Sequence, residues 1–252
     1  MITRLSPPDW RAALAVTGKV VGTSQSEHAH NTLFQAIVQG RVGPACHLAE
    51  QPIADTIGVS RISVRDAIRQ LESAGLVSIY PHRGAFTVSF TPQDIEEIFS
   101  LRAALESLAI RLVAQAAKRT DIARLEDVID EMAAVEARGD RYAGAQADAK
   151  FHGILMEVSG HGRAFASWKR MSAQITMAVY SAASYYDAIG NLAGRHVTII
   201  EGLKSGDADR CERLIVEHII SGSHLLLEAV GRQKLLEDRT RRREHAASEE
   251  DA

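Results

Sequence analysis

The spacing of apolar residues changes character at about Thr91. Before this point, short apolar runs are separated by turn-forming stretches such as QGRVGP, TIGVS, SAGL and PHRGA. Beyond it, apolar residues recur at intervals of three and four up to about Arg232, and no proline follows Pro92. Because proline interrupts helices and this period is that of one helical face, the second region predicts an all-α bundle.

The first region, at about residues 28–90, predicts three helices followed by a β-hairpin. The helices are expected at about residues 32–39, 52–57 and 61–74. Each of these ranges is followed directly by a glycine, at positions 40, 58 and 75, which is typical of a helix end. Ser60 is the expected N-cap of the third helix. The β-rich runs LVSIY and AFTVSF are joined by PHRG, which is typical of a tight hairpin turn. This order is the layout of a winged helix-turn-helix.

The second region predicts a bundle of six to seven helices over residues 91–236, so the chain as a whole is expected to be mainly α. Thr91 with Pro92 marks the start of the first helix. The helices are expected at about residues 92–119, 121–137 (capped by Asp121), 141–158, 164–183, 187–203 and 207–236. We expect residues 1–27 to be a flexible or loosely docked extension, and the charged residues 237–252 to be a disordered tail.

Composition narrows the classes of function. A formal charge of −3 gives no general basic field, so any binding to nucleic acid must depend on a local patch. Cys46 and Cys211 form no CxxC pair and fit a reducing cytoplasm, although the sequence alone leaves a disulfide between them open. We find no apolar run near the ~20 residues of a membrane span and no secretory signal pattern. We therefore expect a cytoplasmic protein that does not bind membranes.

The helix expected at residues 61–74 has an apolar face and an arginine face. Arg61, Arg65 and Arg69 recur every four residues, while the opposite stripe is made of Val64, Ala67, Ile68 and Leu71. A recognition helix enters the major groove by its N-terminal residues, where arginine pairs with guanine through two hydrogen bonds and serine contacts phosphate. The alternative is a solvated arginine face, which the preceding helix and glycine turn in IADTIGVS disfavour.

This stretch resembles the winged helix-turn-helix of GntR-type transcription regulators. IADTIGVSRISVRDAIRQLESAGL fills the family pattern LA-x-x-LGVSR-x-PVREAL-x-x-L-x-x-x-GL, and RGA follows in the wing. The chain departs from the family's usual residues at Pro44-Ala45, where proline-glycine is usual, and at Ile62-Ser63, where threonine-proline is usual. Because Ile62 cannot hydrogen-bond as threonine does, we expect the operator sequence to differ in detail. The resemblance implies operator contacts by Ser60, Arg61 and Arg65 and, from the wing tip to the minor groove, by Arg83 and Gly84.

Candidate metal ligands recur on inward faces of the expected bundle helices. Asp148 and His152, in DAKFH, lie four residues apart and so share a helical face. His196 and His218 keep helical spacing with the apolar residues of their own helices. A lone inward histidine is more often a packed core residue, but three with an aspartate, from three helices, favour a metal site. Neutral imidazole and carboxylate suit zinc first, and also nickel, iron or manganese.

The arrangement of DAKFH followed by RHVTIIEGLKSGDADRCERLIVEHI resembles the C-terminal FCD ligand-binding domain of the FadR branch of the same family. In that domain a D-x-x-x-H helix and two later histidines hold a metal ion inside an all-α bundle. The resemblance therefore implies four metal ligands: Asp148, His152, His196 and His218. Together the two resemblances extend over about residues 28–230.

The same resemblance implies that Arg102, in SLRAALES, faces the cavity and binds the carboxylate of an effector. The alternative from the residues alone is an intrahelical pair with Glu106, four positions later. His161 replaces a family-like asparagine, and we assign it no role.

The expected function is that of a homodimeric transcription regulator. It would read an inverted-repeat operator in double-stranded DNA and bind a small organic acid at its metal site. A second hypothesis keeps the regulator but makes the metal purely structural, or makes it the signal. A third is a metalloenzyme built on the bundle, although no HExxH or comparable motif occurs in the sequence.

Overall fold

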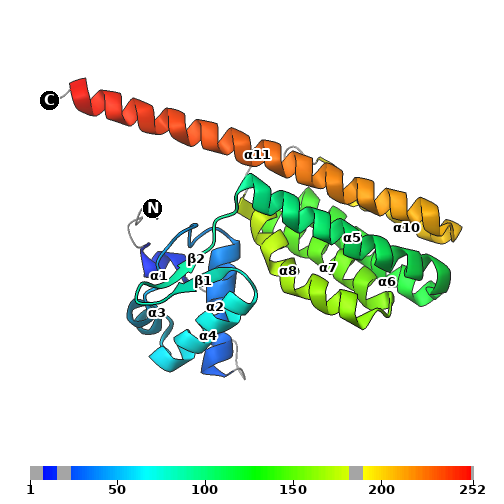
Figure 1. Cartoon of the computed structure of the whole chain (residues 1–252), viewed down its shortest axis with the longest axis horizontal. Coiled ribbons are helices and arrows are strands. Elements are labelled where there is room, and N and C mark those ends of the chain that lie inside the picture. The colour runs from blue at the N-terminus through cyan, green and yellow to red at the C-terminus, as the bar shows by residue number, and fades with distance from the viewer. Residues whose placement is uncertain (1–7, 16–23, 182–189, 251–252) are drawn as a thin grey trace. The chain divides into compact units, whose positions relative to one another are not determined.

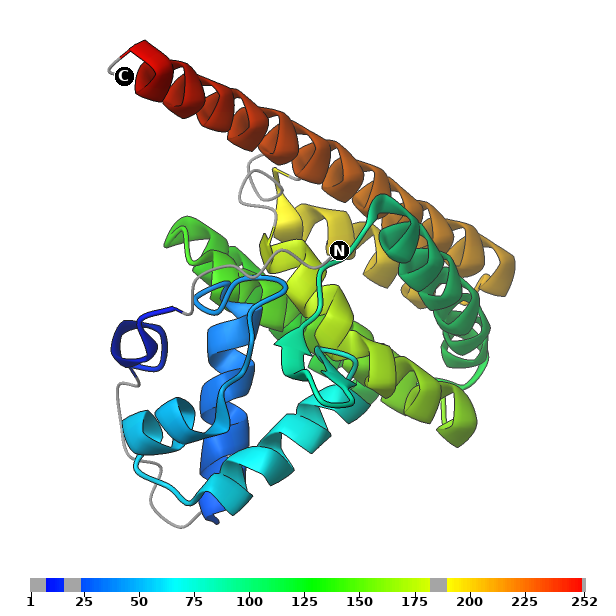
Figure 2. The same cartoon turned by 60° about the vertical axis from the view of Figure 1, so that its left-hand side comes forward.

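The structure is a computed structural model of the chain, and it describes residues 8–15, 24–181 and 190–250. The chain divides into two compact units. Figures 1 and 2 show the helices and strands of both units. The first unit contains the chain up to Thr91 together with Ala166–Ser181, and the second contains Pro92–Phe165 and the residues beyond Ser181. The two units are described separately below.

The first unit contains the expected winged helix-turn-helix, which confirms this part of the fold class. Its helices and strands are α2 (Gln25–Val38), α3 (Glu50–Ile57), α4 (Arg61–Ser73), β1 (Val77–Tyr80) and β2 (Gly84–Thr87). The Oγ of Ser60 caps α4 by accepting a hydrogen bond of 3.1 Å from the backbone N–H of Ser63. Gly58 ends α3 in the left-handed conformation at a φ of 79°, which glycine adopts without a steric penalty.

The core of this unit lies where α4 packs against α2 and α3. The apolar stripe expected on α4 is buried, and so are the residues that face it from the other helices. These buried residues include Leu33, Ile37, Ile53, Val64, Ala67, Ile68, Leu71 and Leu76. The hairpin pairs Val77 with Thr87 and Tyr80 with Gly84, in antiparallel register.

Part of the N-terminal extension, which was expected to be flexible or loosely docked, is docked on the first unit. A short helix, α1 (Trp10–Ala13), is capped by the carboxylate of Asp9, which accepts a hydrogen bond of 3.0 Å from the N–H of Arg11. Trp10, Ala13 and Leu14 are buried, and Arg41 Nη1 donates a 2.5 Å hydrogen bond to the carbonyl of Ala13. Burial of a tryptophan and a leucine stabilises the docked position of this segment. The expectation for residues 1–7 and 16–23 lies outside the described residues.

The boundary expected at residue 28 is also too late. Helix α2 begins at Gln25, and the Oγ of Ser24 accepts a hydrogen bond of 3.1 Å from the N–H of Glu27. A serine N-cap followed by a glutamate in the first turn is a strong local start signal. The helix therefore begins seven residues before the position 32 expected from apolar spacing alone.

The second unit is all-α, as expected. Its helices are α5 (Pro92–Ala116), α6 (Arg119–Ala137), α7 (Arg141–Val158), α10 (Leu192–Ser205) and α11 (Ala208–Glu250), and α8 (Gly162–Ser181) is divided between the units. Helix α11 runs alongside α5, while α6 packs against both α7 and α10 (Figures 1 and 2). Phe99, Ile110, Leu125, Met132 and Phe151 are among its fully buried side chains.

Two helix starts differ from expectation. Asp121 was expected to be the N-cap of its helix, but α6 begins at Arg119 and Asp121 is its third residue. From there its carboxylate accepts a hydrogen bond of 2.9 Å from the N–H of Lys118, so it caps the helix from inside the first turn. Helix α10 begins at Leu192, after the N-cap Asn191, instead of at about residue 187; residues 182–189 lie outside the described residues.

The expected disordered tail is wrong for residues 237–250, because α11 continues through Glu250. After Gly231 the sequence contains neither proline nor glycine, and it is rich in arginine, glutamate and alanine, which are strong helix formers. A mixed charge pattern does not by itself end a helix, and α11 continues beyond the end expected at about residue 236. By length and composition alone, Ala208–Gly231 of this helix could also cross a membrane, a test that core helices of soluble proteins pass as well.

Candidate metal centre and nucleic-acid interface

Four side chains of the second unit converge on one point inside the bundle. Asp148 and His152 come from α7, His196 from α10 and His218 from α11. One possible ligand atom from each residue lies within 4.8 Å of the corresponding atoms of the other three. His152 and His196 are fully buried, whereas Asp148 and His218 are partly exposed. The structure thus brings together all four residues that the sequence nominated as metal ligands.

Hydrogen bonds fix which nitrogen of each buried histidine carries a proton. His152 Nδ1 lies 2.5 Å from Oε2 of Glu106, and His196 Nδ1 lies 2.9 Å from the carbonyl oxygen of Leu192. A carboxylate and a carbonyl only accept hydrogen bonds, so both Nδ1 atoms carry the proton and donate. In the neutral rings, both Nε2 atoms are then left with a lone pair.

The two lone pairs face each other. His152 Nε2 and His196 Nε2 are 3.3 Å apart, and Oδ1 of Asp148 lies 3.3 Å from His196 Nε2 and 3.7 Å from His152 Nε2. Three acceptor atoms this close repel one another unless a cation or a shared proton stands between them. The donor set of imidazole nitrogens and one carboxylate oxygen fits a divalent transition metal ion.

Electrostatics keeps His152, His218 and Asp148 in the state that binds metal. Burial, followed by the positive charge of Arg102, lowers the pKa of His152 despite the opposing carboxylates. Burial and the neighbouring rings of His196 and His152 hold the pKa of His218 well below its usual range. Burial raises the pKa of Asp148, but His152 and His196, when protonated, and the guanidinium of Arg102 outweigh it and hold that pKa far below its usual range. Neutral imidazoles and an ionised carboxylate are the forms that bind metal.

Arg102 and Glu106 form a buried ion pair on α5 that supports the cluster. Arg102 Nε donates to Oε1 of Glu106 at 2.8 Å, so the intrahelical pair is present. The same arginine also lies beside the cluster, with Nη2 3.7 Å from Oδ2 of Asp148. Glu106 therefore joins Arg102 to His152, a role that sequence reasoning missed. Its position gave a signal, because Phe99, Arg102, Glu106 and Ala109 follow one buried face of α5.

Removing the charge of Glu106 is expected to destabilise the bundle strongly. Burial raises the pKa of Glu106, but His152 and Arg102 outweigh it and lower that pKa to about 2. Glu106→Gln leaves the guanidinium of Arg102 buried with its closest anion gone. Breaking a buried pair in this way costs roughly 3–5 kcal/mol, measurable by urea unfolding of the metal-free protein at neutral pH.

The matched control is Glu157→Gln, which removes the same charge from the exposed pair with Arg124 and should cost no more than ~1 kcal/mol. Because the pKa of Glu106 in the folded chain is lower than in the unfolded chain, its stabilisation is present above pH 4.5 and declines as the pH falls towards 2. Equal stability losses in the two variants at neutral pH would contradict the buried ion pair.

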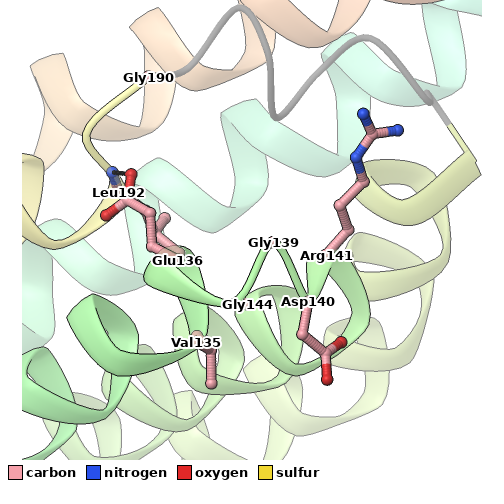
Figure 3. A pocket seen from close by; sticks show the side chains of 8 residues that line it. All are labelled: Val135, Glu136, Gly139, Asp140, Arg141, Gly144, Gly190 and Leu192. Atoms are coloured by element: carbon pink, nitrogen blue, oxygen red, sulfur yellow. Dashed lines mark hydrogen bonds between the residues drawn. The ribbon is translucent and has the colours of Figure 1, made fainter.

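A cavity lies at the N-terminal ends of α7 and α10 (Figure 3). It has a volume of about 260 Å³, enough for a small organic molecule, and its lining is Val135, Glu136, Gly139, Asp140, Arg141, Gly144, Gly190 and Leu192. Gly144 and Leu192 stand one helical turn before Asp148 and His196, on the same faces of α7 and α10. Figure 3 shows Glu136 beside Leu192, whose N–H it accepts at 2.9 Å, while Asp140 and Arg141 point in opposite directions.

His161, to which the sequence assigns no role, lies immediately before α8. Its Nδ1 accepts a hydrogen bond of 3.2 Å from the N–H of Ala164. This is the geometry of a helix N-cap, so the described contact gives His161 a structural role.

The expected DNA-reading residues lie on the first unit. Ser60 is the N-cap of α4, and the side chains of Arg61 and Arg65 on its first turns are 56% and 49% exposed, as a DNA contact requires. Both arginines contact Glu50, the first residue of α3. Arg65 donates from Nε and Nη2 to the two carboxylate oxygens at 2.8 and 2.7 Å, and Arg61 Nη2 donates at 3.3 Å.

The turn of the hairpin carries the other two expected residues. Arg83 is exposed, with its guanidinium 5.6 Å from the centre of the Tyr80 ring. Gly84 has a φ of 95°, and a Cβ there would come within 2.6 Å of Nε2 of His47. This position therefore requires glycine both for its backbone conformation and for the close approach of the His47 ring.

Comparisons with known proteins identify the domains that carry these residues. Residues 25–87 match the domain described as "Bacterial regulatory proteins, gntR family", and residues 97–221 match the FCD domain. The chain is 34% identical over 131 residues to an uncharacterised HTH-type transcriptional regulator of Agrobacterium vitis, covering 51% of this chain and 77% of that protein.

A second relative and a solved structure cover more of the chain. The "Probable D-xylose utilization operon transcriptional repressor" of Paenarthrobacter nicotinovorans is 25% identical over 205 residues, or 81% of this chain and 90% of that protein. The structure of McbR/YncC of E. coli aligns with a TM-score of 0.69 at 18% identity, over 82% of this chain and 98% of that one, which shows a shared fold. These relatives are transcription regulators and not enzymes, which removes the metalloenzyme hypothesis. The chain belongs to the GntR family of DNA-binding transcription regulators and carries a C-terminal FCD domain.

Proposed function

We propose that this regulator's affinity for its operator is controlled by a small carboxylate effector bound at a metal site in the helical unit. The observation that carries the proposal is the pair of histidine Nε2 atoms 3.3 Å apart, both with lone pairs, beside the carboxylate of Asp148. A buried arrangement of this kind is stable only with a cation or a proton in it. Because the chain belongs to a family of DNA-binding regulators with an FCD domain, we expect the first unit to bind an operator in double-stranded DNA and the helical unit to bind the effector.

Asp148, His152, His196 and His218 would hold the ion, which we expect to be zinc, with nickel, manganese or iron as alternatives. When bound, such an ion supplies positive charge and coordination positions that a carboxylate or hydroxyl group can fill. Glu106 fixes the orientation of His152 through its Nδ1–H, and Leu192 does the same for His196.

Arg102 is the residue we propose for the effector's carboxylate. Its side chain is only 4% exposed, and Nη2 lies 3.7 Å from Asp148, at the edge of the cluster. Glu106 holds it there through Nε. A guanidinium kept beside the metal ligands can pair with an anion that also reaches the ion.

We also propose that the protein is a cytoplasmic homodimer that reads an inverted repeat. Helix α5 supports the dimer, because it exposes two leucines seven residues apart, Leu101 (53% exposed) and Leu108 (42% exposed). A stripe of exposed leucines is costly in a monomer and suits the self-complementary interface of a twofold dimer. Two recognition helices related by a twofold axis read two equivalent half-sites.

Effector binding changes the affinity for DNA only if the effector binds the DNA-competent and incompetent arrangements with different free energies. Metal alone can satisfy the facing lone pairs, so a structural metal, or one that is itself the signal, remains the competing hypothesis. The three hypotheses differ in what changes operator binding: a carboxylate effector bound at the metal, the metal ion by itself, or neither if the metal is purely structural.

Calorimetric titration of the metal-loaded protein with a panel of small di- and hydroxycarboxylic acids tests the proposal. We expect at least one acid to bind, and its binding to disappear after chelation and return when the metal is restored. The same acid should change the affinity for the duplex that the protein selects from a random DNA library. Unchanged acid binding after chelation would contradict the metal-bound effector. A change of DNA affinity with metal alone, and none with any acid, would support the sensed metal instead.

A further inference from the structure

One feature of the first unit is not explained by packing or by the expected DNA contacts. Glu50 is acidic, yet it lies among the arginines that should meet the polyanionic DNA. Its side chain is 26% exposed and contacts both Arg61 and Arg65. A carboxylate in this position repels phosphates, so it should weaken DNA binding unless it contributes something else.

The geometry of the pair with Arg65 suggests what that contribution is. A guanidinium can bind a planar two-oxygen partner along either of two edges, one made by Nε and Nη2 and the other by Nη1 and Nη2. Glu50 uses the first edge, with N···O distances of 2.8 and 2.7 Å. The second edge keeps the fork geometry that matches O6 and N7 of guanine.

Glu50 is itself held firmly in place. It is the first residue of α3, where the helix dipole favours a negative charge. Helix α3 packs against α4, with Ile53 and Ala54 buried, so the distance between Glu50 and the first turns of α4 is fixed by the core. Arg65 is a long side chain that would otherwise sample many rotamers at a cost on binding of about 2 kcal/mol.

We infer that Glu50 is a specificity-determining positioning residue, which orients Arg65 for guanine in the major groove and discourages its use as a phosphate contact. The inference rests on the proposed DNA-reading role of Arg65. It adds that sequence selectivity resides in the pair Glu50–Arg65, and not in the arginine alone. Glu50 acts on DNA through Arg65 and touches no base itself.

The inference predicts that the affinities for selected and for scrambled DNA respond differently to one substitution. In Glu50→Gln, Arg65 loses its charged anchor and one negative charge leaves the DNA-facing surface. Affinity for the selected duplex should fall or stay level, while affinity for a scrambled duplex of equal composition should rise. We expect the ratio of the two dissociation constants to shrink by roughly tenfold or more. The salt dependence of scrambled-duplex binding should steepen by about one unit per freed arginine.

Matched variants separate orientation from charge. Glu50→Asp keeps the charge but shortens the side chain, so it should also lose selectivity if orientation matters. Asp55→Asn removes an equal charge from the same helix at an exposed position that contacts Gln51 and neither arginine, and should leave the ratio unchanged. Thermal unfolding of each variant checks that the winged domain is intact.

A double-variant comparison decides the inference. If Glu50 acts through Arg65, then Glu50→Gln should have no further effect on selectivity once Arg65 is alanine. An unchanged selectivity ratio in Glu50→Gln, or an equal change with Arg65 absent, overturns the positioning role and leaves the DNA-reading assignment standing. Normal operator binding by Arg65→Ala alone would overturn both.

Discussion

Replacing His196 with alanine is expected to abolish tight metal binding while leaving the fold intact. The substitution removes one of three imidazoles from a set whose ligand atoms all lie within 4.8 Å of one another. Loss of even a supporting contact to a metal ligand typically lowers metal affinity 10- to 100-fold, so loss of a ligand should lower it by more than ~100-fold. Elemental analysis of the purified protein and competition with a chromophoric chelator measure this directly.

The matched control is His224→Ala, which removes an exposed histidine from α11, the helix that also carries His218. It should retain metal at wild-type stoichiometry. Metal binding also stabilises the folded chain, by ~2.7 kcal/mol when free metal is at 100 times its dissociation constant. Chelation should therefore lower the Tm of the wild type and of His224→Ala, and leave that of His196→Ala unchanged. Wild-type metal content in His196→Ala would rule out the proposed ligand set.

Local signals in the sequence predicted the elements that position the sites. Gly58 and Ser60 delimit the turn and the start of the recognition helix in both sequence and structure. Helix α7 covers the expected Arg141–Val158, and its Asp148–His152 spacing places both residues on one face. Capping residues and apolar period are properties of a few neighbouring residues, so they survive into the fold.

Contacts between distant residues could not be predicted in the same way. Apolar spacing shows that Glu106 faces inward, but not that its partner is His152, 46 positions later. The pairing of Glu50 with Arg65, across two helices, depends equally on how α3 and α4 pack. The sequence does not predict the burial of Trp10, because a short apolar segment is a weak signal and its burial depends on tertiary contacts. It also does not predict the full length of α11, because the charged C-terminal segment is as compatible with a solvated tail as with a helix, and helix propensity decides between them.

The Arg65→Ala variant should lose most of its specific DNA binding. A good bidentate contact to a base contributes ~1–3 kcal/mol, and the proposed dimer, reading two half-sites, would lose it twice. The expected loss of ~2–6 kcal/mol corresponds to a decrease in affinity of roughly 30-fold to more than 10⁴-fold. Fluorescence anisotropy with the duplex selected by the wild type measures it, at one fixed salt concentration because phosphate contacts depend steeply on salt.

The loss has a second source in this protein, because the carboxylate of Glu50 keeps its charge when its partner at 2.7 Å is removed. A carboxylate left with Arg61 alone as its partner carries more uncompensated negative charge at the DNA surface and repels phosphate. The double variant Arg65→Ala with Glu50→Gln should therefore bind all duplexes better than Arg65→Ala, without recovering selectivity. Arg69→Ala, one turn further along the same exposed face of α4, is the control and should weaken binding less, and equally for selected and scrambled duplexes. If Arg69 and Arg65 proved interchangeable in this comparison, the N-terminal turns of α4 would not be the part of the helix that reads bases.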